Sequence, residues 1–503
     1  MTSRFTKILV ANRGEIAVRI FRTCRDMGIR SVAVYSEADA GAKYLDLADE
    51  AYPLHGSTAM ESYLNQEKII KAAKTTGSQA IHPGYGFLSE NEDFASLVVK
   101  EGLVFIGPSP EVIKSLGDKT AARALAIKLG IPVTPGSVDP VQSVGELTSI
   151  ASRIGYPILI KAAGGGGGKG MRVVSSENEL ESSFRGARSE ARNAFDDDRV
   201  YVEKYIDNPR HVEVQILADN HGNVIHLGER ECSIQRRHQK IIEESPSVAV
   251  DETLRSALVD SAVKLARESG YSSAGTVEFL LDGNGNYFFL EVNTRLQVEH
   301  PVTEMRTGID LVREQIRVAE NKPIGYAQKD VTFRGSAVEC RIYAEDPANG
   351  FLPSTGRITH LRAPGGGNIR DERAIQEGDM VSPYYDPLLA KLVTWGESRD
   401  EALARMARAL SEYELFGVRN NLKLCYWIID HPKFRSGKFS TKFLETEFTP
   451  EALQKEMSDV EEFAALAAIH ASVGQDSILS YSTPNGSTKT GSVWLKKRED
   501  SYR

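Results

Sequence analysis

Cysteine, long apolar runs and a leader segment are what this chain has least of. Four of its 503 residues are cysteine, and Cys24, Cys232, Cys340 and Cys425 form no C-x-x-C pair. That spacing argues against a disulfide framework and a structural zinc site, and it fits a reducing compartment. No apolar run approaches the ~20 residues of a membrane span. A strand is predicted almost at the N-terminus, which leaves no room for a signal peptide. We therefore expect a cytoplasmic protein that does not bind membranes.

Two nucleotide-binding fingerprints are also missing. The first strand is followed by Ala11-Asn-Arg-Gly-Glu15 rather than G-x-G-x-x-G, which disfavours an NAD-dependent enzyme. Gly170 follows Lys169 at the place where a Walker A motif requires serine or threonine. The net charge of −8 argues against a nucleic-acid-binding surface, although a local basic pocket is compatible with it.

What the chain has instead is the length and composition of a multidomain globular protein. Its 503 residues suffice for about three domains, and 41% hydrophobic with 26% charged residues is ordinary for that class. Short apolar strands at residues 7–11, 31–35, 80–82 and 104–107 alternate with helical segments, the first of which opens at Gly14. This alternation predicts a parallel, Rossmann-like sheet.

The most informative stretch runs from Asn286 to Pro301. Residues 286–290 are apolar and aromatic and predict a strand. From Glu291 onward, polar and apolar residues alternate, and a strand would send every second side chain to one face. Val292, Leu296 and Val298 would lie on the opposite face, and Pro301 would end the strand. The face so predicted is Glu291, Asn293, Arg295, Gln297 and Glu299.

A hairpin brings a second carboxylate to this face. Residues 276–281 predict a strand, and Asp282-Gly-Asn-Gly285 is a hairpin turn sequence. Folding about that turn places Glu278 nearly opposite Glu291. Like charges opposite each other repel, unless a divalent cation such as Mg²⁺ lies between them. A solvated hairpin face is the alternative interpretation.

A run of five glycines, residues 164–168, follows a strand that ends in Lys161 and precedes Lys169. Glycines cost backbone entropy, but they free N–H groups to bind phosphate oxygens and allow a loop to close over a ligand. A flexible linker is the alternative, although linkers rarely lie between two apolar strands. Residues 135–205 therefore predict a small separate domain with a mobile loop.

Several polar residues stand out elsewhere, and each also has a structural interpretation. Arg236, Arg237, His238 and Lys240 predict an anion site or a solvated loop. Tyr85, after the strand at 80–82, lies on a ligand loop or a packed turn. Period-two alternation places Glu339, Arg341 and Tyr343 on one face, where Arg341 could pair with Glu339. His211 could be a structural histidine, and Lys119 could face solvent.

These motifs together resemble one family. Residues 291–301, Glu-Val-Asn-Thr-Arg-Leu-Gln-Val-Glu-His-Pro, are similar to the signature of biotin carboxylases within the ATP-grasp superfamily. The segments His-Pro-Gly-Tyr-Gly-Phe-Leu-Ser-Glu-Asn at 82–91 and Arg-Arg-His-Gln-Lys at 236–240 resemble the same family, as do 351–358, 382–392 and 416–421. The resemblance extends from about residue 7 to about residue 443, without a major departure at the catalytic positions.

The resemblance implies a mixed α/β and α+β architecture. It comprises a Rossmann-like domain at 1–115, an ATP-grasp region at 116–330 with a mobile glycine-rich lid at about 135–204, and a biotin carboxylase C-terminal domain at 331–447. Residues 448–503 predict a helix from Glu451 to about Ser472, and then a disordered tail rich in serine, threonine and glycine.

The implied function is ATP-dependent carboxylation of biotin by bicarbonate, via carboxyphosphate, with Mg²⁺ or Mn²⁺ and with biotin as a carrier-linked substrate. Glu299 would be the general base, with Lys240, Arg295 and Arg341 as the other catalytic residues. Bicarbonate would be held by Lys240, Arg295, Gln297, the main chain of Val298, and Arg341. The metal would be held by Glu278, Glu291 and Asn293, and biotin would meet Tyr85 and Arg341. Nucleotide contacts would come from Lys119, Lys161, Gly167, Gly168, Glu203, Lys204, Tyr205, Ile206, His211, Gln235, His238, Glu278 and Glu291.

The chain has no Met-Lys dipeptide of the kind that receives biotin, and we expect no room for a carboxyltransferase domain. It should therefore be one subunit of a split enzyme, a homodimer whose partners are a biotin carboxyl carrier protein or domain and a carboxyltransferase subunit. The sequence does not distinguish acetyl-CoA, propionyl-CoA and pyruvate as the final acceptor. Two other classes stay open, namely an ATP-grasp ligase for a different carboxylate and a catalytically silent scaffold subunit.

Overall fold

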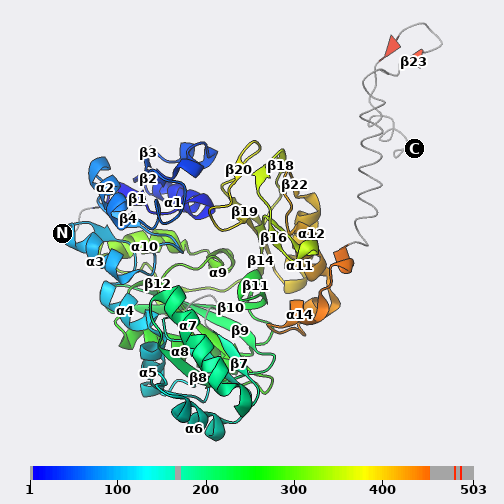
Figure 1. Ribbon diagram of the computed structural model, residues 1–503. Coiled ribbons are helices and arrows are strands. Elements are labelled where there is room, and N and C mark those ends of the chain that lie inside the picture. Colours follow the sequence, from blue (N-terminus) through cyan, green and yellow to red (C-terminus); the bar gives the residue numbers. More distant parts are fainter. Residues whose placement is uncertain (1–3, 165–170, 454–480, 483–487, 490–503) are drawn as a thin grey trace. The chain divides into compact units, whose positions relative to one another are not determined.

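Five parallel strands near the N-terminus form the first layer of the fold. The computed structural model describes residues 4–164, 171–453, 481–482 and 488–489. The strand order is β3-β2-β1-β4-β5, with helices on both faces (Figure 1). Leu9 packs into one apolar cluster, whereas Ile8 and Val10 pack into another, so β1 is covered on both sides. The Rossmann-like prediction is therefore confirmed. The strands are β1 (Lys7–Val10), β2 (Arg30–Tyr35), β3 (Glu50–Pro53), β4 (Ala80–His82) and β5 (Val104–Phe105), joined by α1 (Gly14–Asp26), α2 (Gln66–Thr76) and α3 (Glu92–Lys100).

The centre of the molecule is an eight-stranded sheet in the order β13-β12-β9-β10-β11-β14-β21-β19. The predicted domain border at 330/331 falls between β11 and β14, yet these two strands pair antiparallel, with Ile242 opposite Cys340. The C-terminal part therefore continues the sheet of the ATP-grasp region. The strands are β9 (Arg210–Ala218), β10 (Val224–Arg236), β11 (Gln239–Ser245), β12 (Ser273–Leu281), β13 (Tyr287–Asn293), β14 (Ser336–Tyr343), β19 (Ile369–Arg373) and β21 (Leu388–Gly396).

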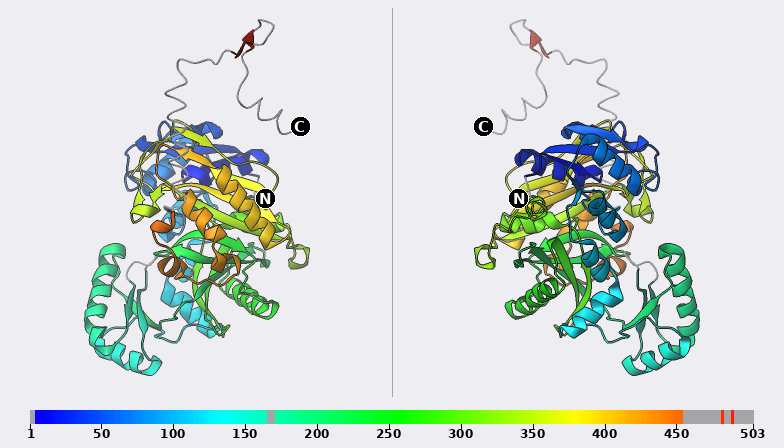
Figure 2. Two further views of the ribbon diagram at one scale, coloured as in Figure 1. Left: turned by 90° about the vertical axis from the view of Figure 1, so that its right-hand side faces the viewer. Right: turned by 90° about the vertical axis from the view of Figure 1, so that its left-hand side faces the viewer.

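A small α/β subdomain projects from this body and stands apart in the side views (Figure 2). Its sheet has the order β7-β6-β8, and Ile158, Ile160 and Val202 form its core against the two helices. This subdomain covers the segment predicted as a lid, but residues 165–170 lie outside the described part of the chain, and with them Gly167 and Gly168. The elements are β6 (Ile158–Ala162), β7 (Arg172–Val174), β8 (Val200–Lys204), α6 (Val144–Ile154) and α7 (Leu180–Phe195).

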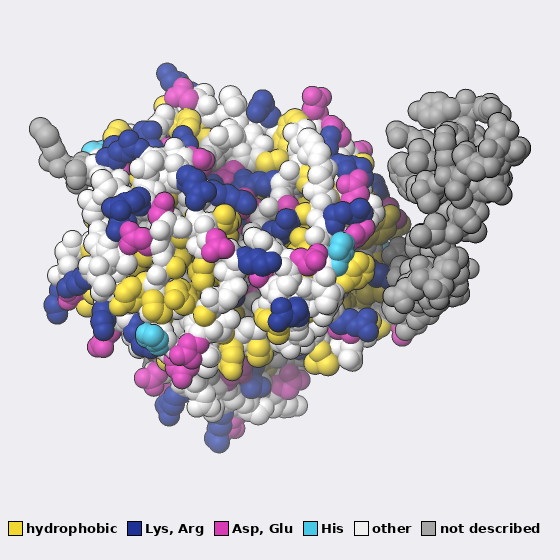
Figure 3. Space-filling view, turned by 90° about the horizontal axis from the view of Figure 1, so that it is seen from above, with side chains coloured by type: hydrophobic (Ala, Val, Ile, Leu, Met, Phe, Trp, Pro, Cys, Tyr) yellow, Lys and Arg dark blue, Asp and Glu magenta, His cyan; other side chains and the backbone are white. Residues whose placement is uncertain are grey.

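Helices cover the central sheet and the C-terminal strands. On β21 and its neighbours, Leu403, Met406 and Ile428 form one apolar cluster. The covering helices are α4 (Pro110–Gly117), α5 (Lys119–Lys128), α8 (Glu252–Glu268), α9 (His300–Thr307), α10 (Leu311–Ala319), α11 (Arg399–Glu412), α12 (Leu422–Asp430), α13 (Pro432–Arg435) and α14 (Phe443–Glu447). Acidic and basic side chains are intermixed on the face seen from above (Figure 3). None of the described helices is long and apolar enough to cross a membrane.

The predicted strand through residues 291–299 is wrong beyond Asn293. β13 ends there, α9 begins at His300, and residues 294–299 form an irregular loop. Pro301 therefore lies in the first turn of a helix, where its missing N–H costs nothing. The loop is held from outside, because the Thr294 N–H donates to Glu90 at 2.9 Å.

Residues 1–448 form one compact unit, and residues 449–503 form a second. The predicted helix from Glu451 lies outside the described residues after Leu453. Within the stretch expected to lack regular structure, Tyr481–Ser482 (β23) and Thr488–Lys489 (β24) pair antiparallel.

Candidate active site

Lys240 is the centre of the polar cluster on the sheet. Its Nζ donates to Glu213 at 2.7 Å, to Glu278 at 3.1 Å and to Glu299 at 2.5 Å. Burial alone would lower the pKa of Lys240, but the surrounding acidic groups raise it well above its usual range. The ammonium is therefore permanently charged, as an anion-binding group must be, and the alternative of a solvated loop does not apply to this residue.

Glu299 is fully buried between two cations. Besides Lys240, its second oxygen accepts from the Arg341 guanidinium at 2.9 Å, and the Cys232 thiol lies 3.8 Å from its first oxygen. Burial raises the pKa of this carboxyl, but Lys240 and Arg341 outweigh burial and hold the pKa well below its usual range. Glu299 is thus a carboxylate at neutral pH.

Arg341 belongs to this site and does not form the ion pair with Glu339 that its position on β14 suggested. Its Nε donates to Glu243 at 2.6 Å, while a terminal nitrogen holds Glu299. The Glu339 oxygens accept no hydrogen bond from the described residues. Glu243 of β11 lies directly opposite Glu339 of β14, two residues along from Arg341, so the Arg341 side chain reaches diagonally across to the neighbouring strand.

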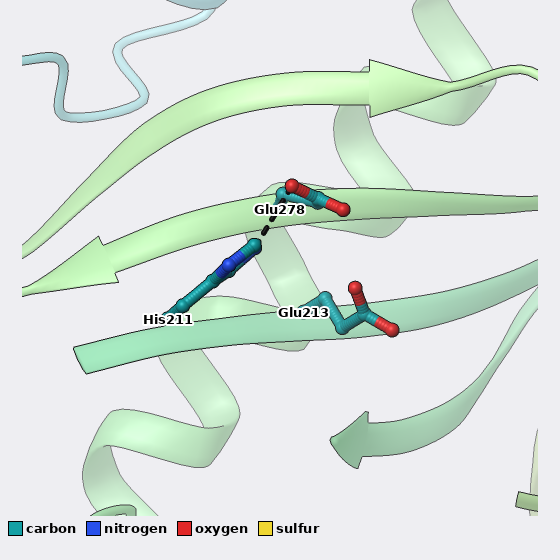
Figure 4. Close-up of side chains that lie close together, drawn as sticks. All are labelled: His211, Glu213 and Glu278. Atoms are coloured by element: carbon teal, nitrogen blue, oxygen red, sulfur yellow. Dashed lines mark hydrogen bonds and ion pairs between the residues drawn. The ribbon is translucent and has the colours of Figure 1, made fainter. Parts of the chain in front are cut away.

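The two carboxylates predicted to face each other do so. Glu278 of β12 lies directly opposite Glu291 of β13. Glu278 is bound by His211 at 2.8 Å, and Figure 4 shows both beside Glu213. Burial raises the pKa of Glu278, but Lys240 and His211 outweigh burial and lower it well below its usual range. Glu291 is paired with Lys119 at 2.6 Å, at the first residue of α5.

Asn293, Arg295 and Gln297 close the site although they do not share a strand. Arg295 donates to Glu90 at 2.8 Å, to Asn293 at 3.0 Å and to Gln297 at 3.0 Å. Asn293 and Gln297 in turn donate to Glu278 at 2.9 and 3.2 Å. The five predicted side chains thus converge through a loop that curls back toward β12.

A second cluster of charged side chains lies where the small subdomain meets α5. Lys161 at 2.6 Å and Arg123 at 2.8 Å hold Glu203, and the Lys204 side chain instead donates to the carbonyls of Gly155 and Tyr156. The Tyr205 N–H donates to Pro157 at 3.1 Å, and Ile206 follows it, half-buried. The Lys204 ammonium is therefore already bound to main-chain carbonyls, and a nucleotide contact at this residue would have to use the main chain.

The remaining predicted residues lie around this centre. Gln235 is buried on β10 opposite Lys240, and His238 is exposed at the β10–β11 turn with a φ of 68°. The Val298 carbonyl accepts from Lys391 at 2.8 Å. The Tyr85 carbonyl accepts from Asn12 at 2.7 Å, and its ring lies 5.7 Å from the Lys391 Nζ.

Some residues of the cluster were missed from the sequence. Glu213 and Gln215 alternate with His211 along β9, so the period that identified the other strand faces could have revealed them. Arg230 is fully buried, and it donates to Glu213 at 2.5 Å and to Gln215 at 2.7 Å. Cys232, Glu243 and Lys391 carry no local signal, because their partners Glu299, Arg341 and Val298 are far away in the sequence.

The first compact unit combines a small α/β subdomain, an antiparallel sheet with opposed carboxylates, and lysines that reach those carboxylates. These three features define an ATP-grasp enzyme. Three family models match consecutive parts of the chain. They are biotin carboxylase, N-terminal domain, over residues 4–113, carbamoyl-phosphate synthase L chain, ATP binding domain, over 118–326, and biotin carboxylase C-terminal domain over 339–446.

Individual proteins agree with these family models. Biotin carboxylase 1 of Bacillus subtilis is 52% identical over 88% of this chain and 98% of its own length. The propionyl-CoA carboxylase alpha chain of Ruegeria pomeroyi is 46% identical over 92% of this chain and 71% of its own. The 2-oxoglutarate carboxylase biotin carboxylase domain dimer of Hydrogenobacter thermophilus, solved with MgADP, ADP and bicarbonate, superimposes with a TM-score of 0.87 at 47% identity, over 90% of this chain and 99% of that one. The chain belongs to the biotin carboxylase family.

Proposed function

We propose that this chain carboxylates biotin on a separate carrier protein, using ATP and bicarbonate. One observation carries the proposal: Lys240 and Arg341 converge on the buried carboxylate Glu299, beside the opposed pair of Glu278 and Glu291. The solved relative that binds MgADP and bicarbonate supports this substrate pair. We assign the site residues the roles that the family resemblance implied.

Bicarbonate is held by cations that already lie together. Lys240, Arg295 and Arg341 would supply N–H donors to the small planar anion, with Gln297 and the Val298 main chain beside them. Holding the anion in line with the γ-phosphate converts a collision into an intramolecular step. Bicarbonate is a poor electrophile, so ATP has to activate its carbon.

Glu299 removes the bicarbonate proton, and anion binding makes it able to do so. With Lys240 and Arg341 both bound to it, the carboxylate is a weak base, because its pKa is held well below its usual range. A bound anion would share those two cations, so the pKa of Glu299 would rise toward the working pH. The deprotonated oxygen of bicarbonate attacks the γ-phosphorus, and the bond between that phosphorus and the bridging oxygen of ATP breaks. ADP departs, and carboxyphosphate is the product.

Carboxyphosphate then gives CO₂ and phosphate. The phosphate takes the N1 proton of biotin, and the biotin enolate so formed captures the CO₂. Arg341 stabilises the negative oxygen of that enolate, and Tyr85 borders the biotin ring. Arg341 can serve both anions because the two occupy its surroundings in succession.

The nucleotide and its metal fit the lid side of the site. Lys119, Lys161 and His211 provide positive charge for phosphates, with His238, Gln235, Glu203 and the 204–206 main chain beside them. Partial desolvation and the neighbouring cations lower the pKa of His238, so His238 would bind a phosphate by hydrogen bonding rather than by charge. Glu278, Glu291 and Asn293 offer oxygen ligands on adjacent strands, which suits Mg²⁺ or Mn²⁺. When bound, the metal would offset charge on the phosphate oxygens.

The assembly is also a proposal. We infer a homodimer, by analogy with the dimer of the solved relative, which works with a biotin carboxyl carrier protein or domain and a carboxyltransferase subunit. The four buried, free cysteines fit a cytoplasmic location. We retain 1–115, 116–330 and 331–447 as functional divisions, with the lid at about 135–204.

The test measures ADP release by the purified chain with ATP and Mg²⁺. We expect release that requires both bicarbonate and free biotin, with carboxybiotin as the product. ADP release that ignores bicarbonate but responds to another carboxylate would identify a different ATP-grasp ligase. Nucleotide binding without any turnover would identify a silent subunit.

A further inference from the structure

Lys391 is a fully buried lysine that none of the assigned roles uses. It lies on β21 with no exposed surface. Its Nζ donates to the Val298 carbonyl at 2.8 Å and lies 3.2 Å from a Glu15 oxygen on α1. A buried ammonium costs several kcal/mol unless good partners compensate it. An apolar side chain would fill this buried position without that cost, so the lysine at residue 391 points to a need for its ammonium group.

The position of Lys391 on the sheet relates it to the catalytic loop. Lys391 of β21 lies directly opposite Arg341 of β14, and paired residues of adjacent strands project from the same face. Arg341 holds the Glu299 side chain, and Lys391 holds the carbonyl of the preceding residue. Side chains from the neighbouring strands β14 and β21 thus bind two consecutive residues of the irregular loop, Glu299 and Val298.

The carbonyl that Lys391 binds belongs to the peptide that joins Val298 to Glu299. Fixing that peptide fixes the direction in which the Glu299 side chain leaves the backbone. It also constrains the main chain of Val298. No helix or strand holds residues 294–299, so the loop depends on side chains such as Lys391 and Glu90 for its shape.

We propose that Lys391 is a positioning residue that orients the Val298–Glu299 peptide for bicarbonate binding and proton removal. This inference rests on the proposed function. Lys391 touches neither substrate in this scheme and acts through the loop, with Glu15 holding its ammonium in place. A purely structural role, which ties α1 to β21, is the competing explanation.

Lys391→Met tests this role, because methionine keeps the length of the side chain and removes the donor. Lys7→Met is the matched control, since Lys7 is another buried lysine, which donates to the Thr76 carbonyl at 2.6 Å far from the loop. We expect Lys391→Met to raise the KM for bicarbonate and to lower kcat. Together the two changes should lower kcat/KM for bicarbonate by roughly ten- to hundredfold. The nucleotide Kd should stay within about twofold, since Lys391 contacts no nucleotide residue.

The outcomes separate the two explanations. Normal bicarbonate KM and kcat per folded molecule in Lys391→Met, with a lowered Tm as in the control, would show a structural role and overturn the inference. If the methionine variant does not fold, Lys391→Arg is measured in the same way. Arginine keeps the positive charge, but its larger guanidinium would displace the Val298 carbonyl. The KM of this variant for bicarbonate should therefore rise, while its Kd for nucleotide should not change. A wild-type enzyme that ignores bicarbonate would instead refute the proposed function, so the two failures are distinguishable.

Discussion

At the scale of single residues, Lys240 shares one ammonium among three carboxylates. Glu213, Glu278 and Glu299 would repel one another at these distances without it. The Lys240 side chain, which stabilises these three carboxylates together, is also the one proposed to hold bicarbonate. The negative charge of bound bicarbonate would therefore meet a cation that is already in place in the buried site.

Replacement of Glu299 by glutamine should remove the base while keeping the volume of the side chain. We expect kcat for biotin-dependent turnover to fall by about 10²–10⁴-fold, whereas the nucleotide Kd should change little. Steady-state kinetics and ADP titration check this. Glu314→Gln is the control, a buried glutamate on α10 whose loss should leave kcat unchanged. Wild-type turnover in Glu299→Gln would assign the base elsewhere.

Lys240→Met should change the pH dependence as well as the rate. Burial raises the pKa of Glu299, and Lys240 is the largest influence that lowers it. Without Lys240 the pKa rises, so a larger fraction of Glu299 is protonated at any given acidic pH. Since the base works only when deprotonated, the acid limb of the kcat/KM profile should move to higher pH.

Lys119→Met provides the comparison, because Lys119 pairs with Glu291 rather than with Glu299. It should weaken nucleotide binding without moving the acid limb. An unmoved limb in Lys240→Met, or an equal shift in both variants, would contradict the assigned coupling between Lys240 and Glu299.

At the scale of elements, the sequence predicted what local periodicity determines. The parallel N-terminal sheet and the opposition of Glu278 to Glu291 both followed from alternation and turn residues. The loop at 294–299 did not, because its alternation is also that of a strand. The contact that shapes it comes from Glu90, 204 residues away from Thr294 in the chain. Lys391 and Glu243 were missed for the same reason, since only the sheet register brings them to the site.

The loop at residues 83–85 shows how one side chain can shape an element. Asn12 is buried and donates to the carbonyls of Pro83 and Tyr85, both at 2.7 Å. Gly84 has a φ of +64°, and an added Cβ would lie 2.9 Å from the Asn12 amide nitrogen. The turn that follows β1 thus sets the position of Tyr85.

Asn12→Ala should therefore displace Tyr85 as well as destabilise the fold. Leaving two carbonyls without their donor costs roughly 1–3 kcal/mol each, and the KM for biotin should rise more than that for ATP. Asn65→Ala is the matched control, because Asn65 caps α2 through the Lys68 N–H and should lower only the Tm. Equal biotin KM values in the two variants would contradict the link to Tyr85.

At the scale of the whole molecule, the eight-stranded sheet joins the ATP-grasp strands to the C-terminal strands. A chain that ends at residue 330 would leave β11 as an open edge, because β11 would keep its pairing with β10 but lose β14, whose Cys340 lies opposite Ile242. We expect that fragment to be aggregated or unfolded by gel filtration and circular dichroism. A chain that ends at residue 448 keeps the whole first unit and should retain bicarbonate-dependent ADP release. A monomeric, folded 1–330 fragment would show that the sheet tolerates division.

The shared sheet also bears on how relatives of this enzyme can be recombined. A hybrid gene spliced at the boundary between the nucleotide-binding and C-terminal modules would match one parent's β11 to another parent's β14. Arg341 would then come from a different ancestor than Glu243 and Glu299, its two partners. Productive shuffling should therefore avoid crossovers between β11 and β14, so that Arg341 is inherited together with Glu243 and Glu299.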